Sequence, residues 1–239
     1  MFGYYYGFDL TYLVLVLPCV ILAMIASVRV NSTFKRYSQI HSYRRITGAD
    51  AAQRVLSANG VRGVRIEKVA GNLTDHFDPR ANVIRLSDSV YDSTSVAAIG
   101  VACHEAGHAV QYAQNYAPIK LRAAIIPITS IGSKLAMPLI LLGLLFSFGE
   151  SVSYGFVYAG IACFALSLVF QLVTLPVEFN ASRRAMNAIA EGNILSEDEQ
   201  KGARNTLTAA AMTYVAATAV ALAQLLRLVL LFGGRRRND

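Results

Sequence analysis

The sequence has few charged residues for its length. Of its 239 residues, 15% are charged and 54% are hydrophobic, whereas a soluble domain ordinarily carries about 25% charged residues. The shortage is concentrated in a few long apolar runs, which indicates a membrane protein. Tryptophan is absent, so tyrosine must supply any aromatic belt at the membrane surface. Tyr4, Tyr5, Tyr6 and Tyr12 stand where the first apolar run begins.

Cysteine is also scarce. Cys19, Cys103 and Cys163 are odd in number and widely spaced, so we expect neither a disulfide framework nor a four-cysteine zinc cluster. A reducing cytoplasmic compartment fits this usage.

Acidic residues are fewer than basic ones, 15 against 22, which gives a net charge of +7. The lysines and arginines lie beside apolar runs and form no separate basic domain. This distribution predicts contact with anionic membrane lipids and no nucleic-acid partner.

Four apolar runs are candidates for membrane helices, at residues 10–28, 118–148, 153–175 and 207–232. The first run is followed, not preceded, by basic residues, which favours an uncleaved anchor with its N-terminus outside over a signal peptide. Charged residues interrupt the second run, so we expect an interfacial piece and then a crossing. A short turn near Phe148 joins it to the third run in a membrane hairpin. Arg235, Arg236 and Arg237 follow the last run, and the sequence leaves open whether that run crosses fully.

The polar segments between these runs predict a small α+β domain. Thr47 is the expected cap of a helix that ends near residue 58, and Gly60 follows it. The other expected elements are strands at 64–69 and 82–86, a turn-rich stretch at 71–79 between them, a helix at 95–116 and a later helix at 177–191.

The expected fold is therefore mainly α: a polytopic membrane protein with about four apolar membrane helices and a small cytoplasmic α+β domain. The expected parts are a membrane anchor (1–28), the α+β part (29–120), the membrane hairpin (121–175), a cytoplasmic helix (176–206) and an apolar helix with a basic tail (207–239).

Residues 104–108 read His-Glu-Ala-Gly-His, an HExxH motif. On a helix, residues four apart share a face, so His104 and His108 can bind one metal ion. Glu105 lies about 100° around the helix, where it can act on a metal-bound water without being a ligand. The motif also occurs by chance, but here it stands on an apolar helix, where a buried glutamate is costly without a metal or a partner. The sequence therefore predicts one catalytic Zn²⁺ per chain, with Glu105 as the general base.

A catalytic zinc site needs a third protein ligand. The candidates are Glu178, His76, His41 and several aspartates. Glu178 is favoured because the membrane hairpin returns it to the side that carries His104. The alternative is that Glu178 only forms a salt bridge with Arg183 or Arg184.

Several stretches resemble the YugP-like membrane zinc metallopeptidases. They are residues 73–79, 85–87, 95–98, 104–111, 176–185 and 207–214, and the resemblance spans almost the whole chain. It implies a protease of the bacterial plasma membrane, with a zinc site on the cytoplasmic side. The chain is also similar to membrane-anchored gluzincins of the heat-shock protease type. Those often carry an aspartate four residues after the glutamate ligand, where this sequence has Ser182.

Other residues near the motif are weaker candidates. His76, Tyr112 and Tyr214 are possible oxyanion-stabilising or substrate-binding residues. His76 equally fits a loop that hydrogen-bonds to itself, and the tyrosines equally fit packing or a membrane interface. The strand at 82–86 is either a sheet edge to which a peptide adds or ordinary sheet. We expect Cys103 to be a small apolar residue pointing off the metal face.

Three classes of function remain. The first is a zinc endopeptidase acting on membrane or membrane-proximal proteins. The second is a zinc-binding membrane assembly or regulatory protein without proteolysis, for which Glu105 would be dispensable. The third is a transporter, which is disfavoured because the uncharged apolar runs lack the ionisable residues of transport paths.

Overall fold

A computed structural model gives the fold and describes residues 10–145 and 150–233. The expected belt residues Tyr4, Tyr5 and Tyr6 lie outside these ranges, as do Phe148 and the three C-terminal arginines.

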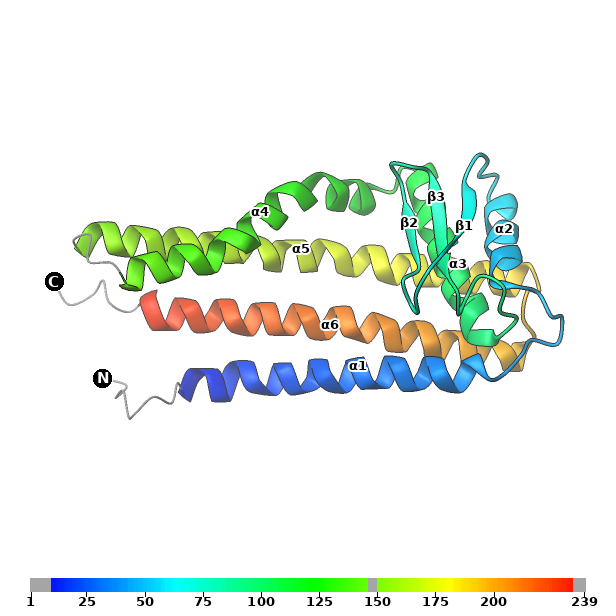
Figure 1. Ribbon diagram of the computed structural model, residues 1–239, viewed down its shortest axis with the longest axis horizontal. Coiled ribbons are helices and arrows are strands. Elements are labelled where there is room, and N and C mark those ends of the chain that lie inside the picture. The colour runs from blue at the N-terminus through cyan, green and yellow to red at the C-terminus, as the bar shows by residue number, and fades with distance from the viewer. Residues whose placement is uncertain (1–9, 146–149, 234–239) are drawn as a thin grey trace. The chain divides into compact units, whose positions relative to one another are not determined.

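Within the described residues, four helices are long and apolar enough to cross a membrane (Figure 1). They are α1 (Leu17–Ser38), which continues a π-helical turn at Tyr12–Val16, α4 (Ala117–Leu145), α5 (Glu150–Glu191) and α6 (Glu197–Gly233). Few side chains in the most apolar stretch of each helix are buried, between 11% and 22%, as expected of helices that face lipid. The predicted fold class, mainly helical with four long apolar helices and a small sheet, is confirmed.

Three of these helices are longer or less interrupted than expected. Helix α4 is one helix through Pro127 and Pro138, and α5 continues through Pro176. The prediction of a separate helix at 177–191 was therefore wrong, while the interfacial piece expected before the second crossing stays a prediction and would be part of the single helix α4. Apolar helices tolerate proline when neighbouring groups satisfy the freed backbone carbonyls.

Helix α6 begins about ten residues before its apolar run. The backbone N–H of Glu199 donates to Ser196 Oγ, and the N–H of Ser196 donates to Glu199 Oε2. This reciprocal pair is a capping box, which starts a helix within polar sequence.

The chain divides into two compact units. One consists of Met1–Ile25, Leu121–Thr174 and Tyr214–Asp239, and carries most of the apolar helical sequence. Within it, glycines let α4 and α5 approach closely: a Cβ atom on Gly160 would lie 2.7 Å from the carbonyl oxygen of Ala136. Small residues commonly have this role between apolar helices.

The second unit consists of Ala26–Lys120 and Leu175–Thr213. It contains a three-stranded sheet of described residues, β1 (Arg65–Val69), β2 (His76–Asp78) and β3 (Val83–Ser87), in the order β1-β3-β2. Strand β3 is parallel to β1 and antiparallel to β2. Because β3 is the central strand, the possibility that 82–86 forms a sheet edge was wrong. The stretch at 71–79, expected to be turn-rich, also contains the edge strand β2.

Two helices pack with this sheet, α2 (Gly48–Ala58) and α3 (Val96–Ala113) (Figure 1). As predicted, Thr47 caps α2, accepting a hydrogen bond from the N–H of Asp50. Ser95 caps α3 in the same way. Helix α3 is buried on most of its surface, and its apolar side chains share one core with α2, β3 and the part of α5 that follows residue 184. The core holds α3 in a fixed orientation, which matters because α3 carries the HExxH motif.

Candidate metal centre

Helix α3 presents both histidines of the motif on one face. The imidazole rings of His104 and His108 have centroids 4.7 Å apart. His108 is 8% exposed and His104 is partly buried. The one-turn spacing therefore brings two ring nitrogens into the same small volume, as helix geometry requires.

Helix α5 supplies a carboxylate to these two rings. Glu178 is 2% exposed, and its Oε2 atom lies 3.3 Å from His104 Nε2 and 3.6 Å from His108 Nε2. One candidate ligand atom from each of the three residues lies within 4.8 Å of the others. Two residues from α3 and one from α5 thus form a candidate metal site.

Gly107 allows the close approach of the two helices. A Cβ atom at this position would lie 2.8 Å from the carbonyl oxygen of Ala181, which is closer than real Cβ atoms come to such an atom. Ala181 is fully buried and lies between Glu178 and Ser182 on α5. The glycine within the motif is therefore what lets the α5 carboxylate reach the α3 histidines.

Polar side chains behind the rings fix their orientation. His108 Nδ1 lies 3.0 Å from Gln111 Oε1. The amide nitrogen of Gln111 donates to the carbonyl of Val177 and to Asn180 Oδ1, so its oxygen is left to accept the Nδ1 proton of His108. This tautomer leaves the Nε2 lone pair of His108 free to bind a metal.

Ser182 has the same relation to His104. Its Oγ atom lies 3.1 Å from His104 Nδ1, where it can accept the ring proton and leave Nε2 as the ligand atom. Ser182 therefore contacts the histidine directly. Neither Ser182 nor Gln111 was among the predicted site residues. A signal was present, because Ser182 is four residues after Glu178 and Gln111 is three after His108, one helical turn in each case.

The donor set fits zinc. Two imidazole nitrogens and one carboxylate oxygen are the ligands of many catalytic zinc sites. With metal–ligand bonds of about 2.05 Å, tetrahedral ligands lie roughly 3.3 Å apart, close to the 3.3 and 3.6 Å observed between Glu178 and the two histidines. Burial lowers the pKa of His108, but its hydrogen bond to Glu178 and the charges of Glu105 and Glu178 outweigh this and raise the pKa overall. The site therefore favours positive charge.

Glu105 lies on α3 beside the ligand face. Its side chain is 8% exposed, and it forms no side-chain hydrogen bond or ion pair with another residue in the described ranges. A carboxylate that is buried without a partner is costly. The negative charge of Glu105 raises the pKa of His108 and that of Asp75.

The rival ligands have other partners. His76 Nδ1 lies 2.8 Å from the carbonyl of Thr74 in its own loop. His41 Nδ1 lies 2.9 Å from Thr94 Oγ1 on the surface. None of the rivals joins the candidate metal group among the described residues.

The two aspartates nearest the sheet also have clear structural roles. Asp75 accepts hydrogen bonds from the backbone N–H and the hydroxyl of Ser87. Asp78 pairs with Arg85 at 3.0 Å and accepts from two backbone N–H groups of its turn. Burial raises the pKa of Asp75, and the charge of Glu105 adds to this.

The remaining candidates differ in their surroundings. Tyr112 is 40% exposed, and its ring meets that of Phe77 edge-on at 6.1 Å. Tyr214 belongs to the other unit. Cys103 is fully buried, and burial raises the pKa of its thiol, so it is a small apolar residue here.

The fold and the donor set together define a class: a protein with apolar membrane helices and a helix-borne HExxH metal centre. The family described as "Putative neutral zinc metallopeptidase" matches residues 12–233, and the chain belongs to this family. It is 43% identical over 214 residues to the "Putative membrane protease YugP" of Bacillus subtilis (strain 168), an alignment that covers 89% of this chain and 93% of the relative. No solved structure matches.

Proposed function

We propose that the protein is a zinc-dependent endopeptidase that hydrolyses peptide bonds of membrane or membrane-proximal proteins at the cytoplasmic face. The observation that carries this proposal is the meeting of His104, His108 and Glu178 within 4.8 Å, with Glu105 buried beside them. One Zn²⁺ per chain is the expected cofactor.

Each residue has a defined task in this reaction. The Nε2 atoms of His104 and His108 and the carboxylate of Glu178 hold the ion, while Ser182 and Gln111 keep the two rings oriented. When bound, zinc supplies a Lewis acid that lowers the pKa of a water molecule and polarises the peptide carbonyl.

Glu105 is the proton acceptor in this proposal. Its carboxylate takes a proton from the attacking water and then delivers it to the amine of the leaving peptide. Its freedom from other hydrogen-bond partners in the described ranges supports this role, since a carboxylate held by a structural partner would have to give up that contact to act as a base.

In this proposal, an extended peptide substrate lies beside α3. Strand β2 pairs only with β3 within the described residues, so its outer edge is open to another strand. Phe77 of β2 contacts Tyr112 of α3, which keeps that edge close to the HExxH helix. The family supports protein substrates, and the four apolar helices support the choice of membrane or membrane-proximal ones.

The cytoplasmic side is proposed from charge. Residues 29–122 and 176–204 carry most of the lysine and arginine of the chain, which favours the inner face, and most of both segments belongs to one compact unit. Single cysteines at the exposed positions Ser57 and Glu191, in a chain without its native cysteines, should react with an impermeant maleimide only after the cell is opened. Labelling of intact cells at either position would contradict this orientation.

Substitution of Glu105 by Gln tests the activity itself. Membranes from cells with the wild-type protein should lack intact substrates that accumulate with the Glu105→Gln protein, as measured by comparative proteomics. The purified variant should keep its zinc and lose peptide hydrolysis. If Glu105→Gln leaves hydrolysis unchanged, or if the wild-type protein binds zinc and hydrolyses nothing, a non-proteolytic zinc protein becomes the better account.

A further inference from the structure

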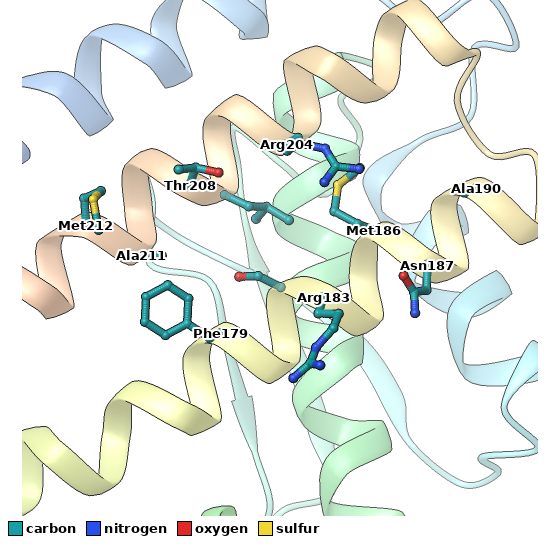
Figure 2. A pocket seen from close by; sticks show the side chains of 11 residues that line it. Phe179, Arg183, Met186, Asn187, Ala190, Arg204, Thr208, Ala211 and Met212 are labelled. Carbon is teal, nitrogen blue, oxygen red and sulfur yellow. The ribbon is translucent and has the colours of Figure 1, made fainter.

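A groove lies between α5 and α6 in the unit that carries the metal centre (Figure 2). Its volume is about 280 Å³, close to the lower limit of ordinary ligand pockets. It can therefore take one or two side chains of a peptide, but not a large ligand.

The groove adjoins the metal centre through α5. Ser182 lines the groove, and its hydroxyl is also 3.1 Å from His104 Nδ1. Phe179, another lining residue, directly follows Glu178. The groove and the metal centre thus share helix α5 and lie in the same compact unit, and Ser182 takes part in both.

The two ends of the groove differ in chemistry. Figure 2 shows Phe179 and Met212 at one end, and Arg183 and Arg204 toward the other. The first two side chains are 44% and 41% exposed, so the groove offers apolar surface to water.

Arg183 and Arg204 have no side-chain partner among the residues that the structure describes. Both are exposed, and neither forms a side-chain hydrogen bond or an ion pair with any residue in the described part of the chain. The neighbouring Arg184 differs, because it donates to Asn180 Oδ1 and Gln114 Oε1 and stacks near Tyr116. Arg184 is structural, whereas Arg183 and Arg204 remain available for an anion.

We propose that this groove is the substrate-selecting subsite, and that it binds a peptide segment in which a large apolar residue adjoins an acidic one. The apolar side chain lies against Phe179 and Met212, and the carboxylate pairs with Arg183 and Arg204. The positive charges of Arg183 and Arg204 disfavour a peptide with lysine in place of the acidic residue. This inference rests on the proposed peptidase function. An anionic lipid offers similar chemistry, but the position of the groove on α5, the helix that carries Glu178, in the unit that holds the metal centre, favours a peptide.

Peptide binding to the full-length Glu105→Gln protein in detergent tests the groove without cleavage. Four fluorescent peptides are compared by anisotropy. They differ only in one pair of adjacent residues, which is Leu-Glu, Leu-Gln, Leu-Lys or Ala-Glu. The Leu-Glu peptide should bind most tightly. Arg183→Glu combined with Arg204→Glu should weaken it about tenfold and strengthen the Leu-Lys peptide, since exposed charge pairs contribute modestly but measurably.

Two further variants make the result specific. Arg54→Glu with Arg62→Glu makes the same charge change at exposed positions outside the groove and should leave the preference for Leu-Glu intact. Thr208→Trp fills the groove from an exposed lining position and should weaken the Leu-Glu and Leu-Gln peptides alike. All variants should retain zinc, which reports that the site is folded.

The outcomes separate this inference from the proposed function. Unchanged peptide preference in the double reversal would overturn the groove assignment, even if the wild-type protein cleaves peptides. The groove assignment would also be overturned if the double reversal bound phosphatidylglycerol vesicles more weakly but bound peptides as the parent protein does. That result would assign the groove to lipid. The predicted binding pattern in a protein that never cleaves would support the groove and overturn the catalytic proposal.

Discussion

Substitution of Gly107 by Ala perturbs the metal centre without touching a ligand. The added Cβ atom would lie 2.8 Å from the Ala181 carbonyl oxygen, whereas carbon and oxygen atoms in close contact are about 3.3 Å apart. Helices α3 and α5 must therefore separate locally by roughly 0.5 Å, which is about the tolerance of a functional constellation of side chains.

The expected loss can be estimated from two opposing effects. Overpacking a buried contact costs about 1–3 kcal/mol, while replacing glycine by alanine within a helix stabilises it by about 1 kcal/mol. The free energy of unfolding should thus fall by at most about 2 kcal/mol. Zinc affinity should fall by about tenfold or more, because Glu178 and Ser182 move away from the histidines together.

Gly100→Ala is the matched control on the same helix. Its Cβ atom would meet Ala203 at 3.4 Å, an ordinary contact, so this variant should match or exceed the wild-type stability and bind zinc normally. Competition with a chromophoric chelator measures the affinities, and thermal unfolding in detergent measures stability. Equal zinc affinity in Gly107→Ala and Gly100→Ala would refute the role assigned to the close helix contact.

Three further predictions concern neighbouring side chains. Ser182→Ala should weaken zinc binding by about 10- to 100-fold, since it removes the acceptor behind His104; unchanged affinity in the chelator assay would exclude that role. Burial raises the pKa of Asp75, so its folded-state pKa exceeds the unfolded value, and stability is lost as pH rises through the folded pKa. Asp75→Asn should reduce this loss of stability with rising pH, in the range between the unfolded and the folded pKa of Asp75. If the variant and the wild type lose stability equally over that range, the raised pKa of Asp75 is contradicted. Glu178→Gln should lose most zinc and all turnover, whereas Glu105→Gln should keep zinc, so elemental analysis of the two proteins distinguishes a ligand from a base.

The sequence predicted the features that depend on local periodicity. The long apolar runs predicted four helices, because a helix must be about 20 residues long to cross a bilayer. The HExxH spacing placed two histidines on one helical face, and residue type together with the return of the chain singled out Glu178 for the position it has in the structure. These inferences need only helix geometry and the order of segments.

Other features depend on contacts distant in the chain. Strand β2 is three residues long and pairs only with β3 among the described residues, so no local pattern reveals it. The continuity of α5 through Pro176 contradicts the usual breaking effect of proline. The start of α6, in contrast, could have been predicted from the sequence, since Ser196 and Glu199 have the spacing of a capping box.

The polar partners of the histidines were the harder part of the site. Gln111 and Ser182 have suitable spacings, but their roles depend on how closely α3 and α5 pack. That distance is set by Gly107 against Ala181, a contact between residues more than seventy positions apart. The sequence motif supplies two candidate ligands, whereas tertiary packing supplies their orientation.

A zinc titration of activity tests the central claim most directly. Purified full-length protein is stripped with a chelator, zinc is returned in known amounts, and hydrolysis of a peptide substrate is followed at each step. We predict no hydrolysis in the stripped protein and a linear recovery that levels off at one zinc per chain. Hydrolysis that persists without zinc, or that does not return when one equivalent is bound, would contradict the account.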